Sequence, residues 1–167
     1  MADSFVTFPD PVLTQRASPR PLDPDLRAVG GKLLAMGRQH QVYGLAAAHI
    51  GLVEPVVLVS LSEPQSRDYR LLYNPEIVDL GGATAPGTEG SVSMPGIEVT
   101  IVRHAEAEIA FDDADGTRQV LRLSGFAARV AQHEIDQMNG LFFLDRLSRL
   151  KRDTAIRRFR KLGSGAK

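Results

Sequence analysis

The positions of apolar residues predict two helices, one near the start of the chain and one in its C-terminal half. Apolar side chains recur every three or four positions over residues 26–36, which predicts an amphipathic helix of about 16 residues. Asp23 suits the N-cap of this helix and Pro24 its first helical position. A second apolar face runs through residues 126–138, and Ser124 suits its N-cap.

Shorter apolar segments bounded by turn signals predict strands over residues 56–61, 71–80, 97–103, 105–111 and 117–123. Residues 81–96 are rich in Gly, Pro, Ser and Thr, and we interpret them as a long functional loop. Mixed or antiparallel strands gathered around one buried helix are typical of an α+β fold.

The length of 167 residues predicts a single domain, which we place at residues 1–162, followed by a flexible tail at 163–167. The 20 basic residues balance the 20 acidic ones, so no net charge recruits nucleic acid or a membrane. A last helix, predicted over residues 148–162, is nevertheless basic. The segment 145–161 holds eight basic residues: Arg146, Arg149, Lys151, Arg152, Arg157, Arg158, Arg160 and Lys161.

The chain contains no cysteine, which removes disulfides, thiolate metal ligands and thiol nucleophiles. Its first residues lack the basic and apolar regions of a signal peptide, and no apolar run approaches the roughly 18 residues of a membrane span. We therefore expect a cytoplasmic protein without a membrane partner.

Residues 132–140 contain half of a metal-site motif. Two histidines at positions i and i+4 of a helix can bind one ion, and a glutamate after the first can take a proton from metal-bound water. Here His133 and Glu134 supply the first half, but Gln137 stands at the i+4 position. A neutral amide oxygen is a weak ligand where a d-block ion prefers nitrogen.

Three segments, residues 44–49, 89–93 and 133–137, read GLAAAH, EGSVS and HEIDQ. Their order and spacing resemble the signature motifs of bacterial peptide deformylases, G-x-G-L-A-A-x-Q, E-G-C-L-S and H-E-x-D-H. The resemblance covers nearly the whole chain, from Pro9 to Lys151. It implies a peptide-deformylase-like α+β fold, in which strands surround the central helix that carries the third motif.

In that family a divalent ion, usually iron, is held by the cysteine of the second motif and both histidines of the third. The glutamate acts as general base and acid, while the glutamine and the amide after the cysteine polarise the formyl oxygen. The resemblance implies that His133 keeps its role as a ligand, Glu134 its role in proton transfer and the Val92 N–H its role as oxyanion donor.

Three departures fall on the chemistry: Ser91 replaces the cysteine, Gln137 the second histidine and His49 the glutamine. A hydroxyl stays protonated near neutral pH and cannot replace a thiolate. We therefore expect no tightly bound metal. The alternative is a rebuilt site for Fe, Zn or Ni on His133, with Ser91, Gln137 and His49 as weak candidate ligands.

The role of His49 stays open at this point. It can complete a rebuilt metal site with His133, act as base toward Ser91 in a metal-free catalyst, or simply fill an inert pocket. Asp136 is expected to be structural, paired with Arg103, and His40 and His104 are expected at the surface.

The resemblance also implies a pocket for the substrate and its first side chain. Its expected residues are Tyr43, Gly44, Leu45, Gly90, Phe126, Arg129 and Val130. The expected ligand is an N-formyl- or N-acyl-aminoacyl small molecule or peptide. In bacterial deformylases a corresponding C-terminal helix can dock on ribosomal RNA, so the basic last helix is a candidate RNA contact.

Two classes of function follow. One is a divergent amide hydrolase or acyl-transfer enzyme, distinct from a housekeeping deformylase, in which Glu134 and His133 work with Ser91 or His49. The other is an inactive homologue that keeps the fold and pocket for binding or regulation. Retention of Glu134 favours the enzyme, since a binding module needs no acid or base there. Loss of the ligands favours the second class.

Overall fold

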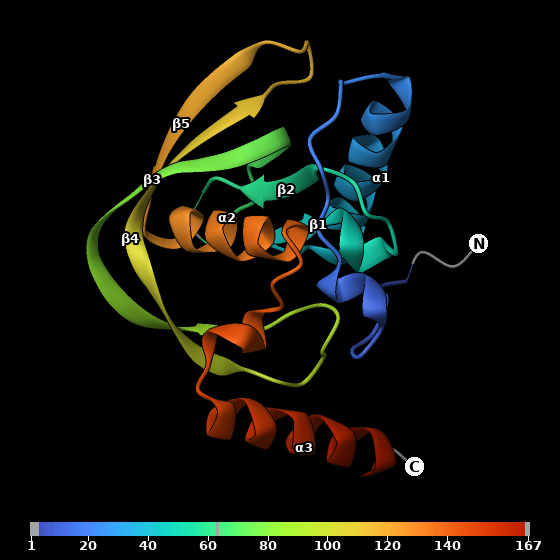
Figure 1. Cartoon of the computed structure of the whole chain (residues 1–167), viewed down its shortest axis with the longest axis vertical. Coiled ribbons are helices and arrows are strands. Elements are labelled where there is room, and N and C mark those ends of the chain that lie inside the picture. The colour runs from blue at the N-terminus through green and yellow to red at the C-terminus, as the bar shows by residue number, and fades with distance from the viewer. Residues whose placement is uncertain (1–3, 63, 166–167) are drawn as a thin grey trace.

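The helix α2 (Gly125–Met138) lies inside a sheet that curls around it, as Figure 1 shows. The computed structural model describes residues 4–62 and 64–165. Five antiparallel strands follow one another in chain order across the sheet, and the architecture is α+β as predicted. The strands are β1 (Gly44–Ala46), β2 (Val56–Ser60), β3 (Tyr69–Glu89), β4 (Val99–Asp112) and β5 (Arg118–Ser124).

Two more helices and three short 3-10 helices complete the described chain. The helices are α1 (Pro24–His40) and α3 (Arg149–Gly165), and the 3-10 segments are η1 (Pro11–Thr14), η2 (Ala47–Ile50) and η3 (Phe143–Arg146). The predicted start of α1 is confirmed, because the Asp23 side chain accepts a hydrogen bond from the Leu26 N–H at 2.8 Å. Its apolar face packs on β1 and β2.

The strands β3 and β4 differ from the prediction. Residues 81–89 are part of β3 rather than a loop, and the two strands predicted over 97–103 and 105–111 are one continuous strand, β4. Three register shifts interrupt their pairing. Such irregularities bend a strand and increase its twist, which lets the pair wrap around α2.

Nearly every side chain of α2 from residue 127 to 138 is buried. Its apolar residues fill a core formed with β2, β4 and β5. Ser124 has the extended backbone of an N-cap, although its side chain makes no capping hydrogen bond. Because the helix also buries polar residues, each of those needs a partner inside the protein. This requirement shapes the site described below.

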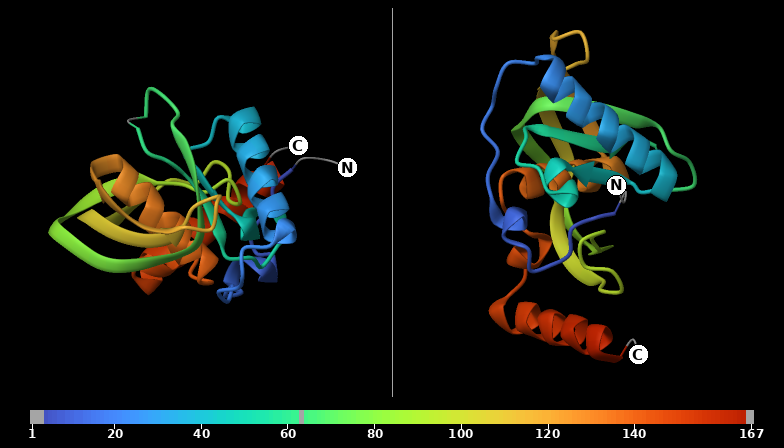
Figure 2. Two further views of the ribbon diagram at one scale, coloured as in Figure 1. Left: turned by 90° about the horizontal axis from the view of Figure 1, so that it is seen from above. Right: turned by 90° about the vertical axis from the view of Figure 1, so that its right-hand side faces the viewer.

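The helix α3 lies at the far end of the molecule from β5, and Figure 2 shows it from two further sides. Ala155, Ile156 and Phe159 pack on a core cluster near η3, and most of its basic residues are exposed. The helix includes residues 163–165 and so extends past the predicted end of the domain, while 166–167 lie outside the described residues. No described helix is long and apolar enough to cross a membrane.

Candidate active site

A cavity of about 430 Å³ lies beside α2, where β1, the end of β3 and the loop 90–98 meet. Most of the predicted site residues line it, whereas Leu45 is fully buried in the core beneath α1 and Gln137 lies behind the cavity wall. The predicted residues in its lining are Tyr43, Gly44, His49, Gly90, Ser91, Val92, Phe126, Arg129, Val130, His133 and Glu134.

An aromatic wall closes one side of the cavity. The rings of Tyr43 and Phe126 meet edge to face, with centroids 4.8 Å apart. The Arg67 guanidinium lies 4.0 Å from the centre of the Tyr43 ring and makes a cation–π contact with it. This wall suits a flat or apolar portion of a ligand.

His133 on α2 is fixed by Glu89 at the end of β3. Its Nδ1 lies 2.8 Å from Oε1 of Glu89, and both side chains are buried. Burial alone would raise the pKa of Glu89, but hydrogen bonds from His133 and then Arg103 outweigh it and hold that pKa at about 2. Glu89 is therefore an acceptor, so Nδ1 of His133 carries the proton and Nε2 of the neutral ring is a base.

Burial works against the charged form of His133, but the neighbouring carboxyl groups of Glu134 and Glu89 raise its pKa above the ordinary value. The imidazole is therefore a stronger proton acceptor than a free histidine. A base that is oriented through one nitrogen, with the other available, is the arrangement that catalytic histidines use.

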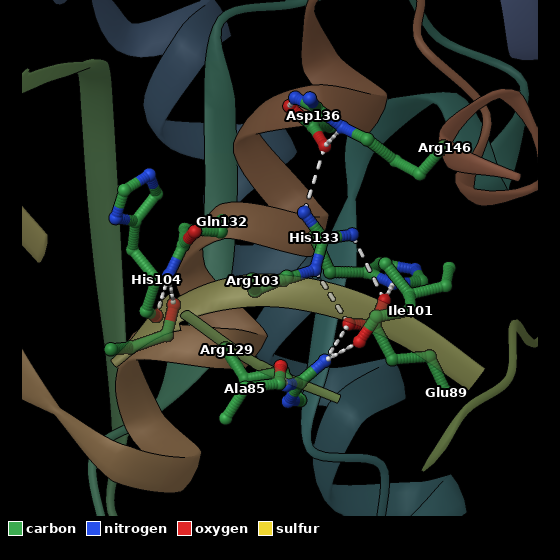
Figure 3. A network of polar contacts seen from close by, with 11 residues as sticks. Ala85, Glu89, Ile101, Arg103, His104, Arg129, Gln132, His133, Asp136 and Arg146 are labelled. Carbon is green, nitrogen blue, oxygen red and sulfur yellow. Dashed lines mark hydrogen bonds and ion pairs between the residues drawn. The ribbon is translucent and has the colours of Figure 1, made fainter. Parts of the chain in front are cut away.

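A buried ionic network, drawn in Figure 3, supports this pair. Arg103 on β4 donates to both oxygens of Glu89, at 2.5 and 2.9 Å, and to Asp136 at 2.9 Å. Asp136 also receives two hydrogen bonds from Arg146, at 2.9 and 2.8 Å. The predicted Arg103–Asp136 pair is thus confirmed. The network ties α2 to β3, β4 and η3 around His133.

Glu134 points into the same site but has no hydrogen-bond partner at Oε1 among the described residues. Burial raises its pKa to about 7 despite the opposing effect of His133. The carboxyl group can therefore give or take a proton near neutral pH. Gly44 makes room for it, since a Cβ there would lie 2.7 Å from Val130 and 2.9 Å from Glu134.

The hydrogen bonding and burial of His49 indicate which of its ring nitrogens carries the proton. Its Nδ1 accepts a hydrogen bond from the backbone N–H of Ala46 at 3.0 Å, so this nitrogen must carry a lone pair. Burial, and next the charge of His133, lower the pKa of His49 to about 3, so the ring is neutral. Its proton is therefore on Nε2, which is buried and unpartnered in the described structure. His49 is a donor at Nε2.

Ser91 and Val92 form the turn after β3. The Ser91 Oγ accepts a hydrogen bond from the Ser93 N–H at 3.1 Å, which leaves its own O–H free. No hydrogen bond of the described residues uses the Val92 N–H. The turn therefore offers a hydroxyl and a free amide donor side by side at the cavity.

Sequence reasoning missed the roles of Glu89 and Arg103, although Glu89 belongs to the second motif. The available signal was Glu89 itself, the first residue of the second motif and a charged residue in a segment of small and weakly polar residues. The surface placement of His40 is correct. That of His104 is wrong, because the residue is half-buried and its Nδ1 is enclosed.

Comparison with known proteins places the chain in a family. The family model for polypeptide deformylase matches residues 2–153. The chain belongs to the polypeptide deformylase family. A "Peptide deformylase-like" protein of Rhizobium meliloti is 39% identical over 158 residues, covering 94% of this chain and 91% of the relative. A "Peptide deformylase" of Mesorhizobium japonicum is 33% identical over 160 residues, covering 95% and 91%.

Solved structures agree with this assignment. The crystal structure of peptide deformylase from Ehrlichia chaffeensis matches with a TM-score of 0.89 at 29% identity, covering 98% of this chain and 97% of that one. The predicted deformylase-like fold is therefore confirmed. The three segments that carried the resemblance, residues 44–49, 89–93 and 133–137, meet around α2 in this fold.

Proposed function

We propose that this deformylase-family protein is an amide hydrolase or acyl-transfer enzyme that acts on an N-formyl- or N-acyl-aminoacyl group without a tightly bound metal. It is distinct from a housekeeping deformylase. The observation that carries the proposal is the 2.8 Å bond from His133 to Glu89, because it orients a base in the cavity that Ser91 also lines.

The chemistry of the donor set argues against the metal that the family implies. Ser91 offers a neutral hydroxyl, and Gln137 offers only its neutral amide oxygen, a weak ligand, since its amide nitrogen donates to the Leu13 carbonyl at 2.6 Å. His49 would have to bind through Nε2, the nitrogen that carries its proton. His133 is left as one strong ligand, so these residues do not fit a tightly held ion.

The first half of the proposed reaction forms an acyl-enzyme. Ser91 Oγ attacks the acyl carbon while Nε2 of His133 takes the hydroxyl proton, and Glu89 stabilises the imidazolium through Nδ1. The Val92 N–H donates to the developing oxyanion. The hydrogen bond from Ser93 to Oγ lowers the cost of charge on that oxygen.

The second half releases the amine and the acyl group. The C–N bond breaks as the nitrogen takes the proton of the imidazolium, either directly or by way of Glu134, whose pKa of about 7 suits a group that relays a proton, and His133 is neutral again. Water then attacks the Ser91 ester, with His133 again as base, and gives the carboxylic acid. Attack by another nucleophile in place of water gives acyl transfer.

His49 fits a supporting role as a second oxyanion donor, since its Nε2–H is fixed by the Ala46 bond and the residue lines the cavity. A neutral imidazole can polarise a carbonyl without donating its proton fully. The competing roles, base toward Ser91 and metal ligand, both require the lone pair that this tautomer lacks at Nε2.

The test is turnover of a panel of N-formyl- and N-acetyl-aminoacyl amides by wild type, Ser91→Ala and His133→Asn. We expect each variant to lose at least 10³-fold in kcat, while a chelator leaves the wild type unchanged. Ser62→Ala, at a residue outside the cavity lining whose hydroxyl donates to the Ser66 carbonyl in the loop after β2, serves as the matched control and should keep full activity.

Loss of activity on chelation, with Ser91→Ala still active, would replace this proposal by a rebuilt metal site. Tight binding of an N-acyl-aminoacyl amide by wild type without any turnover would instead indicate the binding or regulatory homologue.

A further inference from the structure

Arg129 on α2 forms part of the cavity wall and is held there by three hydrogen bonds. Its Nη1 donates to Glu89 Oε2 at 2.7 Å and to the Ile101 carbonyl at 2.8 Å, and its Nη2 donates to the Ala85 carbonyl at 2.9 Å. Figure 3 shows the side chain reaching from α2 toward Glu89 and Ala85. A guanidinium has five N–H donors, so Nε–H and one Nη2–H remain without an acceptor among the described residues.

Gly87 on β3 makes space for this guanidinium. A Cβ at Gly87 would lie 2.6 Å from Cζ of Arg129, 2.7 Å from Nε and 2.8 Å from Nη2. The glycine backbone therefore lies directly against the guanidinium, and a side chain at this position would displace the group. The absence of a side chain at Gly87 therefore allows Arg129 to pack against β3.

The charges near the cavity do not cancel. Arg146 pairs with Asp136 through two hydrogen bonds on the outer side of the network. The whole network sets three arginines, Arg103, Arg129 and Arg146, against Glu89 and Asp136, which leaves one excess positive charge. Arg129, which lines the cavity, has 17% of its side chain exposed, compared with 3% for Arg103 and 5% for Glu89.

We infer that the substrate carries an anionic group, such as the side-chain carboxylate of an acidic N-acyl-aminoacyl residue, that binds the free edge of Arg129. A carboxylate matches the paired donors of a guanidinium edge. The inference rests on the proposed function, from which it takes the N-acyl-aminoacyl part of the substrate. It adds that the side chain of that aminoacyl residue is negatively charged. The lining also holds Glu134, whose pKa of about 7 leaves it partly uncharged near neutral pH, and Glu98, which is exposed and screened by solvent.

The test compares two ligands of equal shape, N-acetyl-glutamyl-alaninamide and N-acetyl-glutaminyl-alaninamide, by isothermal titration calorimetry. The measurements use a Ser91→Ala background so that the ligands stay intact. We expect the acidic ligand to bind about tenfold or more tightly than the neutral one, as a charge-assisted hydrogen bond at a partly buried site provides. This comparison needs no change at Arg129 and stands even if variants there fold poorly.

Arg129→Met should bring the affinity ratio to about one, because the positive charge that distinguishes the acidic ligand from the neutral one is then absent. Gly87→Ala should do the same by displacing the guanidinium. Arg122→Met, at an exposed arginine on β5 that pairs with Glu108 outside the cavity, is the matched control and should keep the preference.

Equal affinity of the two ligands for the background protein would overturn the inference while leaving the proposed function intact. A preference for the acidic ligand that survives Arg129→Met would also overturn it, because the anion would then bind elsewhere. Binding of neither ligand would overturn the proposed function and this inference together.

Discussion

Replacement of Glu89 by glutamine should destabilise the protein by about 3 kcal/mol, because the change removes the one negative charge between Arg103, Arg129 and His133. The lowering of the Glu89 pKa from 4.5 to about 2 corresponds to about 3 kcal/mol of stabilisation at neutral pH. Loss of one partner of a buried pair costs a similar amount, about 3–5 kcal/mol. The amide would also place its own N–H donors against the guanidinium groups.

Urea unfolding of wild type and Glu89→Gln, followed by circular dichroism at several pH values, measures this contribution. Since the folded-state pKa is lowered, the stabilisation is full above the ordinary value of 4.5 and is lost as the pH falls toward 2. The difference between the two proteins should therefore shrink below about pH 4.5. Glu106→Gln on the exposed face of β4 is the control. A difference under about 0.5 kcal/mol at pH 7 would refute the reasoning.

Three further predictions concern the site. Gly44→Ala should lower kcat/KM by about 100-fold, because the added Cβ would displace Glu134 and Val130. Steady-state kinetics measures this loss, and a thermal melt of the variant shows whether it remains folded. Elemental analysis of the purified wild type should find well under one equivalent of iron, nickel, cobalt or zinc, and a stoichiometric ion would contradict this prediction. The double variant Ser91→Cys, Gln137→His should bind a full equivalent, and with cobalt it should show a thiolate charge-transfer band. His49→Gln keeps an N–H donor at this position and should retain most activity, while His49→Phe should lose about 100-fold in kcat at unchanged KM. Equal activity of the two variants would show that His49 does not donate to the oxyanion.

Much of the fold could be predicted because local signals agree with the tertiary structure. Asp23 and Pro24 begin α1 where capping chemistry places a helix start, and the apolar spacing of α2 matches its burial. The resemblance of residues 44–49, 89–93 and 133–137 to three family motifs then predicted that these segments lie together. These features depend on residues close in sequence or on a pattern shared by a family.

The second half of β3 could not be predicted in the same way. Residues 81–89 are poor in strand-forming residues and include Pro86, yet they pair with β4. β2 pairs only with residues 69–73 of β3, so the second half of that strand has a free edge, where a proline is tolerated. Pairing with a distant segment therefore overrides local propensity.

The candidate residues of the site were largely predictable, but their roles were not. The sequence named His49 and left three roles open, and the backbone hydrogen bond from Ala46, which bears on its tautomer, could not be foreseen from the sequence. Likewise, Glu89 gains its role only because the end of β3 lies against α2, where it meets His133 and Arg103. Protonation and orientation depend on contacts that span the fold.

The most direct test of the central claim is mass spectrometry of the wild-type protein, freed of metal by a chelator and quenched in acid during turnover of an activated N-acyl-aminoacyl ester. The account predicts a covalent acyl group on the peptide that contains Ser91, and its absence in Ser91→Ala. Turnover that requires added metal and leaves Ser91 unmodified would contradict the account.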